Sequence, residues 1–337
     1  MSTNNSSNNS TNNTYFDNYY DYDDYYDYNG ILASRNKFKL FIGSCYICYT
    51  LILIILQIIL FIIFLKKKVM LSNMPYRIML HLGIYSFSQQ ICHFISGVYL
   101  IFNIKLQTWY GFAVGSVSES SYITSVAFVF ILTVNRLDVM FNQQLFPTLS
   151  RKIFFTTLII ICHCFFLLLF VFFQLPHFRV FFNPECFCWK FEKSDKKNYI
   201  AFQVQNKTVV ILLTLSLILY IIIFLKVITM RWQKSSDKQI QLSDMKILFQ
   251  ALFNYVTIVF LETCLLFSNE LTWELDNGYS FIDLINVIIC GNNTILTYIM
   301  SSDIRNEVFK TIWQRHKNNN KVISLRSFSR KFNRNIL

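Results

Sequence analysis

Long runs of apolar residues, separated by short polar stretches, dominate the chain from residue 41 to residue 301. About 20 apolar residues in a helix span the hydrocarbon core of a bilayer, because each residue adds about 1.5 Å to a thickness of about 30 Å. Segments of this length occur at residues 41–65, 76–101, 110–136, 152–175, 205–230, 246–268 and 280–301. The pattern predicts an all-α integral membrane protein, a bundle of seven transmembrane helices.

Polar segments flank this bundle. Residues 1–40 form a low-complexity tail, first rich in Asn and Ser and then in Tyr and Asp, which lacks the apolar residues needed for a core and is expected to be disordered. In residues 302–317, apolar residues recur at helical spacing opposite a basic face, which predicts a short amphipathic helix in the membrane interface. Residues 318–337 are a basic tail that either binds anionic membrane lipid or is simply solvated.

The composition agrees with a membrane protein. Hydrophobic residues make up 54% of the chain and charged residues 15%, whereas soluble domains carry about 25% charged residues. Seven of the nine cysteines lie in predicted spans, where cysteine acts as a small apolar residue. Cys186 and Cys188 lie in an outer loop, but their spacing does not fit a metal site, and we expect no metal or other cofactor.

The distribution of basic residues predicts the orientation of the bundle. Placing the amino terminus outside puts 21 of the 31 Lys and Arg residues on the inner side and 10 on the outer side. Inner loops of membrane proteins carry such an excess. The basic residues are spread over several loops instead of being massed on one domain, which argues against nucleic-acid binding.

Ionisable residues inside membrane spans are costly and mark function or internal pairing. His93, Glu119 and Glu262 lie 16 or 17 residues from Arg77, Arg136 and Lys246 at the inner ends of their spans, which places all three roughly 25 Å above the inner charges. The sequence therefore predicts a ligand cavity in the outer half of the bundle, lined by His93, Ser118, Glu119, Tyr122, Ser125 and Glu262. The alternative is a hydrogen bond between His93 and a glutamate that only packs helices.

Other uses of these three residues are poorly supported by sequence. No catalytic motif such as H-E-x-x-H or G-x-S-x-G accompanies them, so an enzyme is not expected. A transporter or channel with an ion path through the three residues remains an alternative from another class. However, the chain has only 8 Gly and 4 Pro and no internal repeat, and "FVFILTV" below Glu119 is apolar.

The third predicted span ends in "FILTVNRLDVMF", and its Asn135–Arg136 pair resembles the arginine motif of G-protein-coupled receptors. The resemblance implies that Arg136 is held by polar groups in the inactive state and offered to a G protein in the active state, with Tyr220 and Tyr298 as activation residues. Other hallmarks are missing: "NNTILTYIM" has no proline, and no cysteine tops the third span.

These departures resemble the nematode serpentine chemoreceptors of the Srt and Srx type. The similar segments are "NMPYRIMLHLGIYSFSQQICHFISGVYLI", "DMKILFQALFNYVTIVFLETCLLF" and "TYIMSSDIRNEV", which contains Arg305. The resemblance extends from Ser72 to Val308. It implies a chemosensory receptor in the plasma membrane of a sensory neuron or its cilium, with an external small-molecule or peptide ligand and a heterotrimeric G protein as partners.

The outer tail carries predicted modification sites. Sequons begin at Asn4, Asn5, Asn8, Asn9 and Asn12 in the tail and at Asn206 farther along the chain. The alternation of Tyr and Asp resembles the sulfated tails of chemokine and other peptide receptors, which implies possible sulfation sites at Tyr19, Tyr20, Tyr22, Tyr25, Tyr26 and Tyr28. Two alternatives therefore stay open. The chain is a peptide receptor that uses its acidic tail, or the tail has no function of its own.

The predicted orientation can be tested with epitope tags at the two ends of the chain. In intact cells the tag at the amino end should be accessible to antibody, because the basic loops hold the other end inside. The tag at the carboxyl end should become accessible only after permeabilisation. Labelling of both tags in intact cells would require an even number of spans and would contradict the seven-helix prediction.

Overall fold

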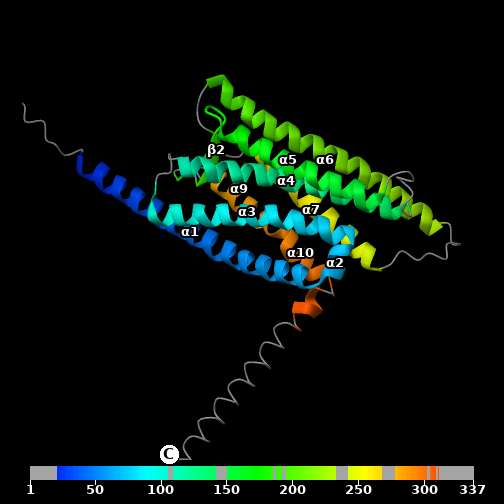
Figure 1. Cartoon of the computed structure of the whole chain (residues 1–337). Helices are drawn as coiled ribbons and strands as arrows, with labels where there is room; N and C mark the ends of the chain where they lie inside the picture. Colours follow the sequence, from blue (N-terminus) through cyan, green and yellow to red (C-terminus); the bar gives the residue numbers. More distant parts are fainter. Residues whose placement is uncertain are drawn as a thin grey trace, which may run out of the picture.

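The computed structural model describes residues 21–104, 109–141, 150–184, 187–191, 195–232, 242–267, 278–301, 304–308 and 310. The long helices are α1 (Asp21–Lys66), α3 (Met74–Phe102), α4 (Trp109–Met140), α5 (Arg151–Gln174), α6 (Asp195–Trp232), α7 (Leu242–Leu266) and the pair α9 (Gly278–Cys290) and α10 (Asn292–Met300). Short elements are α2 (Lys68–Ser72), β1 (Val180–Asn183) and β2 (Cys188–Phe191). The long helices run side by side as one bundle (Figure 1), and each predicted span coincides with one helix or with the α9–α10 pair.

Among the described residues, five helices are long and apolar enough to cross a membrane: α1, α4, α5, α6 and α7. The helices α9 and α10, bent by 40° at Gly291, make a sixth candidate when taken as one span. The remaining predicted span is α3, whose polar residues include Gln89, Gln90 and His93. These polar side chains are buried in the bundle, so α3 can cross a bilayer without exposing them to lipid.

Helix α4 is the centre of the bundle. Within its most apolar window 83% of the residues are buried, compared with 22% for α5 and 28% for α6. It packs against α3, α5 and α6, and it is rich in serine, including Ser116, Ser120 and Ser121, which are fully buried. Small residues allow helices in a membrane to approach closely. The peripheral helices instead present large apolar side chains outward, such as Leu168 and Phe224.

Helix α1 begins earlier than predicted. The sequence pattern places the boundary between the tail and the first span at residue 40, whereas the structure has helix from Asp21, and this part of α1 projects beyond the bundle (Figure 1). Residues 21–40 contain no proline, and Asp21, Asp23 and Asp24 stand in the first turn, where negative charge favours a helix N-terminus. Residues 1–20 lie outside the described residues.

A two-stranded antiparallel hairpin covers one end of the bundle. Strand β1 pairs with β2 from Val180↔Phe191 to Asn183↔Cys188. Phe182 and Phe187 of the hairpin segment pack in a cluster with Tyr46 of α1 and Val287 of α9. We call this end the outer end, as the charge pattern predicts. Cys188 is disulfide-bonded, and the described cysteines inside the helices are free.

The hairpin rests directly on the backbone of α4. A Cβ atom added at Gly115 would lie 2.2 Å from the carbonyl oxygen of Val180. Only glycine fits this approach, because the facing atom belongs to the backbone and cannot rotate away. The outer end of α4 has no cysteine that could link it to the outer loop. The two segments are instead in close packing contact at Gly115.

Replacing Gly115 with alanine should push the hairpin away from α4 and lower the free energy of unfolding by about 1–3 kcal/mol, the usual range for overpacking. The midpoint of thermal denaturation of the purified receptor measures this loss. Gly83→Ala is the matched control, because its Cβ would come within 3.0 Å only of Nε2 at the far end of the Gln57 side chain, a group that has no hydrogen bond to lose among the described residues. An equal or larger loss for the control would contradict the role of the Gly115 contact.

Candidate functional site

Three carboxyl groups from three helices come together near the outer end. Glu119 of α4 lies one helical turn below Gly115 and the hairpin, and it interacts electrostatically with Glu262 of α7 and Asp283 of α9. The two glutamates are the ones that the sequence placed at one depth. Asp283 was missed, although an acid inside the apolar run "FIDLINV" is the same signal.

Two of these carboxyl groups have a tyrosine as hydrogen-bond donor. The hydroxyl of Tyr122 donates to Oε1 of Glu262, and the hydroxyl of Tyr46 donates to Oδ2 of Asp283 over 3.0 Å. In contrast, Oε2 of Glu119 is buried and has no hydrogen-bond partner among the described residues. The three acids are therefore not equivalent.

His93 lies beside this cluster without being bonded to it. Its side chain is 0% exposed, and its ring meets the ring of Tyr46 edge to face, with centroids 6.5 Å apart. Neither ring nitrogen has a hydrogen-bond partner among the described residues. The alternative interpretation, a hydrogen bond between His93 and a glutamate that only packs helices, is therefore wrong for this structure.

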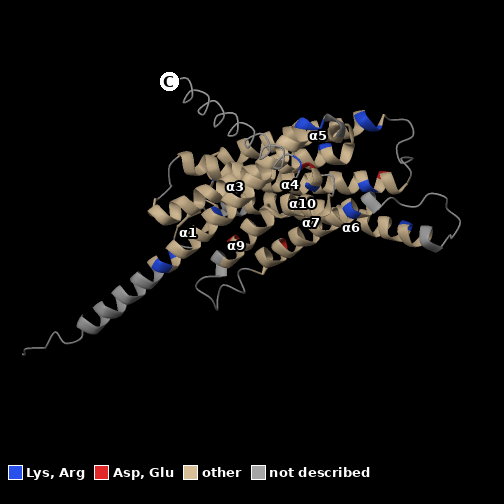
Figure 2. Ribbon diagram, turned by 90° about the horizontal axis from the view of Figure 1, so that it is seen from below, with Lys and Arg blue, Asp and Glu red and all other residues tan. Residues whose placement is uncertain are grey.

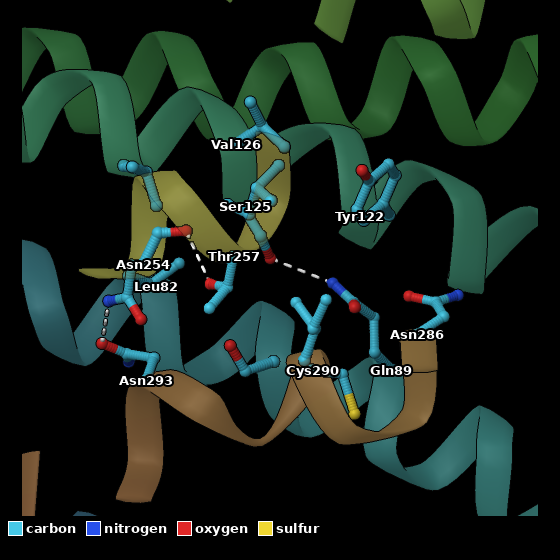
Figure 3. A pocket seen from close by; sticks show the side chains of 14 residues that line it. Leu82, Gln89, Tyr122, Ser125, Val126, Asn254, Thr257, Asn286, Cys290 and Asn293 are labelled. Carbon is cyan, nitrogen blue, oxygen red and sulfur yellow. Dashed lines mark hydrogen bonds between the residues drawn. The ribbon is translucent and has the colours of Figure 1, made fainter. Parts of the chain in front are cut away.

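A cavity of about 40 Å³ lies below the acids, between α3, α4, α7 and the α9–α10 pair. Tyr122 and Asn286 lie at one end of it, near Gln89, which donates to the hydroxyl of Ser125 over 3.0 Å (Figure 3). Of the predicted ligand residues, Tyr122 and Ser125 line this cavity. The other four, His93, Ser118, Glu119 and Glu262, are not among the lining residues.

Hydrogen bonds between side chains hold the last span in the inner half of the bundle. Gln250 of α7 donates to Thr297 over 2.8 Å, and Asn254 of α7 donates to Asn293 over 3.3 Å. On the other side of the span, Thr294 donates to Gln57 of α1. This network was missed in the sequence because its members are single polar residues, spaced along apolar helices without a motif.

Asn135 and Arg136 are both 0% exposed at the inner end of α4. Tyr220 of α6 lies within electrostatic reach of Arg136, and its ring is 5.3 Å from the ring of Tyr255 of α7. The structure therefore brings Tyr220 close to Arg136. The side-chain amide of the neighbouring Asn135 has no hydrogen-bond partner among the described residues.

The acid near Arg136 belongs to a different ion pair. Oδ2 of Asp138 lies 2.9 Å from Nε of Arg151 at the start of α5. The Asp138 side chain is 2% exposed and that of Arg151 29%. This ion pair fastens the inner end of α4 to α5, and the sequence did not single it out, because the two residues are separated by a loop.

Tyr298 and Arg305 lie at another place, beside α1. The hydroxyl of Tyr298 donates to the carbonyl of Leu56 over 2.8 Å. Arg305 donates to the carbonyl oxygens of Tyr298 and Ile299, which lack helical partners at the end of α10. The structure thus gives both residues partners in the region where α10 meets α1.

The segment after the last span is helical over residues 304–308. Ile304 is fully buried against Leu60, Ile63 and Phe64 of α1. Lys67 lies 3.1 Å from Glu307, and its hydrogen bond lowers the pKa of that carboxyl. Beyond Lys310, the rest of the predicted amphipathic helix and the basic tail lie outside the described residues.

Most predicted modification sites are outside the described part of the chain: Asn4, Asn5, Asn8, Asn9, Asn12, Tyr19 and Tyr20. Tyr22, Tyr25, Tyr26 and Tyr28 lie in the outer part of α1. Asn206 lies inside α6, and its side-chain oxygen is buried. Within the described residues, no group of three or more His, Cys, Asp or Glu is placed to hold a metal ion.

A bundle of membrane-spanning helices with buried polar groups at both ends of a central helix defines a multi-pass helical membrane protein. Residues 10–321 match the model of the family described as serpentine type 7TM GPCR chemoreceptor Srt, and the chain belongs to this nematode family. The match confirms the predicted resemblance, the seven-transmembrane class and a receptor in place of an enzyme. No curated protein matches the chain.

The ion pair between Asp138 and Arg151 predicts an unequal response to mutation. Arg151→Gln leaves the buried carboxylate of Asp138 without a partner and should lower the free energy of unfolding by about 1–3 kcal/mol. Asp138→Asn should cost less, because the partly exposed Arg151 can turn to water. The midpoint of thermal denaturation measures both changes.

Lys152→Gln, at the exposed neighbouring position, is the control for Arg151→Gln. The double variant Asp138→Asn with Arg151→Gln should be more stable than Arg151→Gln alone, since it removes both charges. Equal midpoints for Arg151→Gln and Lys152→Gln would show that the pair does not stabilise the inner end.

Proposed function

We propose that this chain is a chemosensory receptor that binds an external small molecule in the outer half of the bundle and activates a heterotrimeric G protein at its inner end. The observation that carries the proposal is the pairing of two buried polar sites on the central helix α4. Glu119 and Tyr122 belong to the outer site, and Asn135 and Arg136 belong to the inner one. Membership of a chemoreceptor family supports the same assignment.

The proposed ligand site comprises His93, Ser118, Glu119, Tyr122, Ser125 and Glu262, to which the structure adds Tyr46 and Asp283. Side chains from α1, α3, α4, α7 and α9 meet there, beneath the hairpin. A ligand held between these helices interacts with all of them at once. The cavity of about 40 Å³ below the acids supports a small cue in preference to a peptide that would need a wide opening.

The signal has a physical route along helix α4 and its neighbours. Arg136 follows Glu119 by 17 residues in one continuous helix, a distance of roughly 25 Å. Tyr122 connects α4 to α7 through Glu262, and α7 reaches the last span through Gln250. A ligand that changes the Tyr122–Glu262 contact therefore changes how α7 packs on α4, and it favours whichever state binds it better.

The inner end supplies the surface for a G protein. Arg136 is buried in this structure, and many of the basic residues lie along α5 and α6 (Figure 2). We assign Asn135, Arg136 and Tyr220 to the activation switch, and Tyr298 and Arg305 to the junction between α10 and α1. The plasma membrane of a sensory neuron, including its cilium, and an outer tail glycosylated at its sequons belong to the same proposal.

Arg136→Ala should abolish nucleotide exchange on the heterotrimeric G protein while leaving surface expression close to normal. The reason is that Arg136 is the permanent charge at the inner mouth of the bundle and is the group offered to the G protein. Lys152→Ala, a basic residue exposed on α5, is the control and should keep exchange. Full exchange by the Arg136→Ala receptor would contradict the proposed switch.

A further inference from the structure

The three outer carboxyl groups lack a counter-ion. Glu119, Glu262 and Asp283 form no ion pair with a lysine or arginine among the described residues. The ion pairs found between described residues are all at the inner end, where Asp138 and Glu307 are the acids. Acidic groups are thus concentrated in the outer half without the basic partners that a structural network would contain.

Burying such groups in a membrane bundle is unfavourable. An ionised carboxylate in a medium of low dielectric constant costs several kcal/mol unless it is paired or hydrogen-bonded. Ionisable groups inside membrane spans are for this reason rare and associated with function. Glu262 and Asp283 each accept a hydrogen bond from a tyrosine, so the cost of burial falls mainly on Glu119, and a positively charged partner would offset it.

Glu119 is the member that remains open to a new partner. The donors Tyr122 and Tyr46 are already used by Glu262 and Asp283, whereas Oε2 of Glu119 accepts no hydrogen bond from a described residue. The surroundings contain a second, independent sign of an incomplete site. His93, beside Tyr46, is fully buried, and both of its ring nitrogens lack a partner among the described residues.

The geometry also provides room for a small charged group. Tyr122, one turn from Glu119 on the same face of α4, lines the cavity of about 40 Å³ together with Asn286 (Figure 3). A cavity needs about 10–15 Å³ of such space to hold one water molecule, so this cavity has room for a group of a few atoms, such as an ammonium, next to the turn of α4 that carries Glu119. Glu119 itself is not among the residues that line the cavity. The ring of Tyr122, which lines the cavity, adds a face that attracts cations.

We infer that the external ligand carries a positively charged nitrogen, and that Glu119 is the carboxylate that pairs with it. This inference rests on the proposed ligand role of the outer site and names the chemical class of that ligand. An organic amine fits better than a metal ion, because the acids and His93 are not placed as a metal-binding group among the described residues. An ammonium needs only one close carboxylate and hydrogen-bond acceptors around it.

The test uses the purified full-length receptor and a panel of primary amines, each paired with the alcohol of the same carbon skeleton, from propylamine with propanol to 2-phenylethylamine with 2-phenylethanol. Ligands that bind only the folded receptor raise the midpoint of thermal denaturation. At least one amine should raise the midpoint in a saturable way, and its alcohol should not. A panel without any stabilising amine, or one in which the alcohols stabilise equally, would overturn the inference.

Variants then assign the charge to Glu119. Glu119→Gln keeps the size of the side chain and removes its charge, and it should weaken the stabilising amine at least about tenfold, the loss of one charge-assisted hydrogen bond. Glu119→Asp keeps the charge and should retain most of the effect. Unchanged amine binding in the Glu119→Gln receptor would overturn the role of Glu119. If neither variant folds, the comparison of amines with alcohols on the unaltered receptor still decides the ligand class.

The failure of this inference can be distinguished from the failure of the proposed function. Nucleotide exchange on the heterotrimeric G protein is measured separately, with the Arg136→Ala receptor as its control. Amine binding without any exchange would contradict the proposed coupling and support the amine site. Exchange stimulated by the neutral alcohols, and not by the amines, would support the receptor and contradict the amine.

Discussion

Most of this structure depends on the need of polar side chains inside a membrane protein to find partners within the bundle. Lipid offers no hydrogen bonds, so each buried polar group raises the energy unless another helix satisfies it. Helix α4 lies at the centre of the bundle, where other helices surround its polar side chains. In its most apolar stretch, 83% of the residues are buried. Its serines and Gly115 let α3, α5, α6 and the hairpin approach closely, and lipid is left to the apolar faces of the outer helices.

The same requirement explains how the seventh span is held. The α9–α10 pair is bent by 40° at Gly291 and contains no proline. Its polar residues Asn293, Thr294 and Thr297 are fastened to Gln250 of α7 and Gln57 of α1 by side-chain hydrogen bonds. These hydrogen bonds connect the last span to both neighbouring helices. A movement of α7 would therefore also shift the last span and, through it, α1. Such connected packing allows a small change at the outer site to alter the inner end.

The outer site leaves some polar groups without partners, as the inner end does at Asn135. Gln90 and His93 of α3 are fully buried and lack hydrogen-bond partners among the described residues, and one oxygen of Glu119 is in the same condition. A protein selected only for stability would replace these groups with apolar ones. Their retention next to a hairpin that closes the bundle is what makes the outer half a binding site in our proposal and not simply a core.

The sequence by itself determined the elements and the depth of the polar groups, because hydrophobic length and helical rise are local properties of the chain. It predicted the seven spans, the family and the common level of Glu119, Glu262 and His93. Only the tertiary structure decided which groups meet, since helix rotation and packing depend on all neighbours at once. It joined Tyr122 to Glu262 and Asp138 to Arg151, added Asp283, and left His93 without the glutamate partner that equal depth alone had suggested.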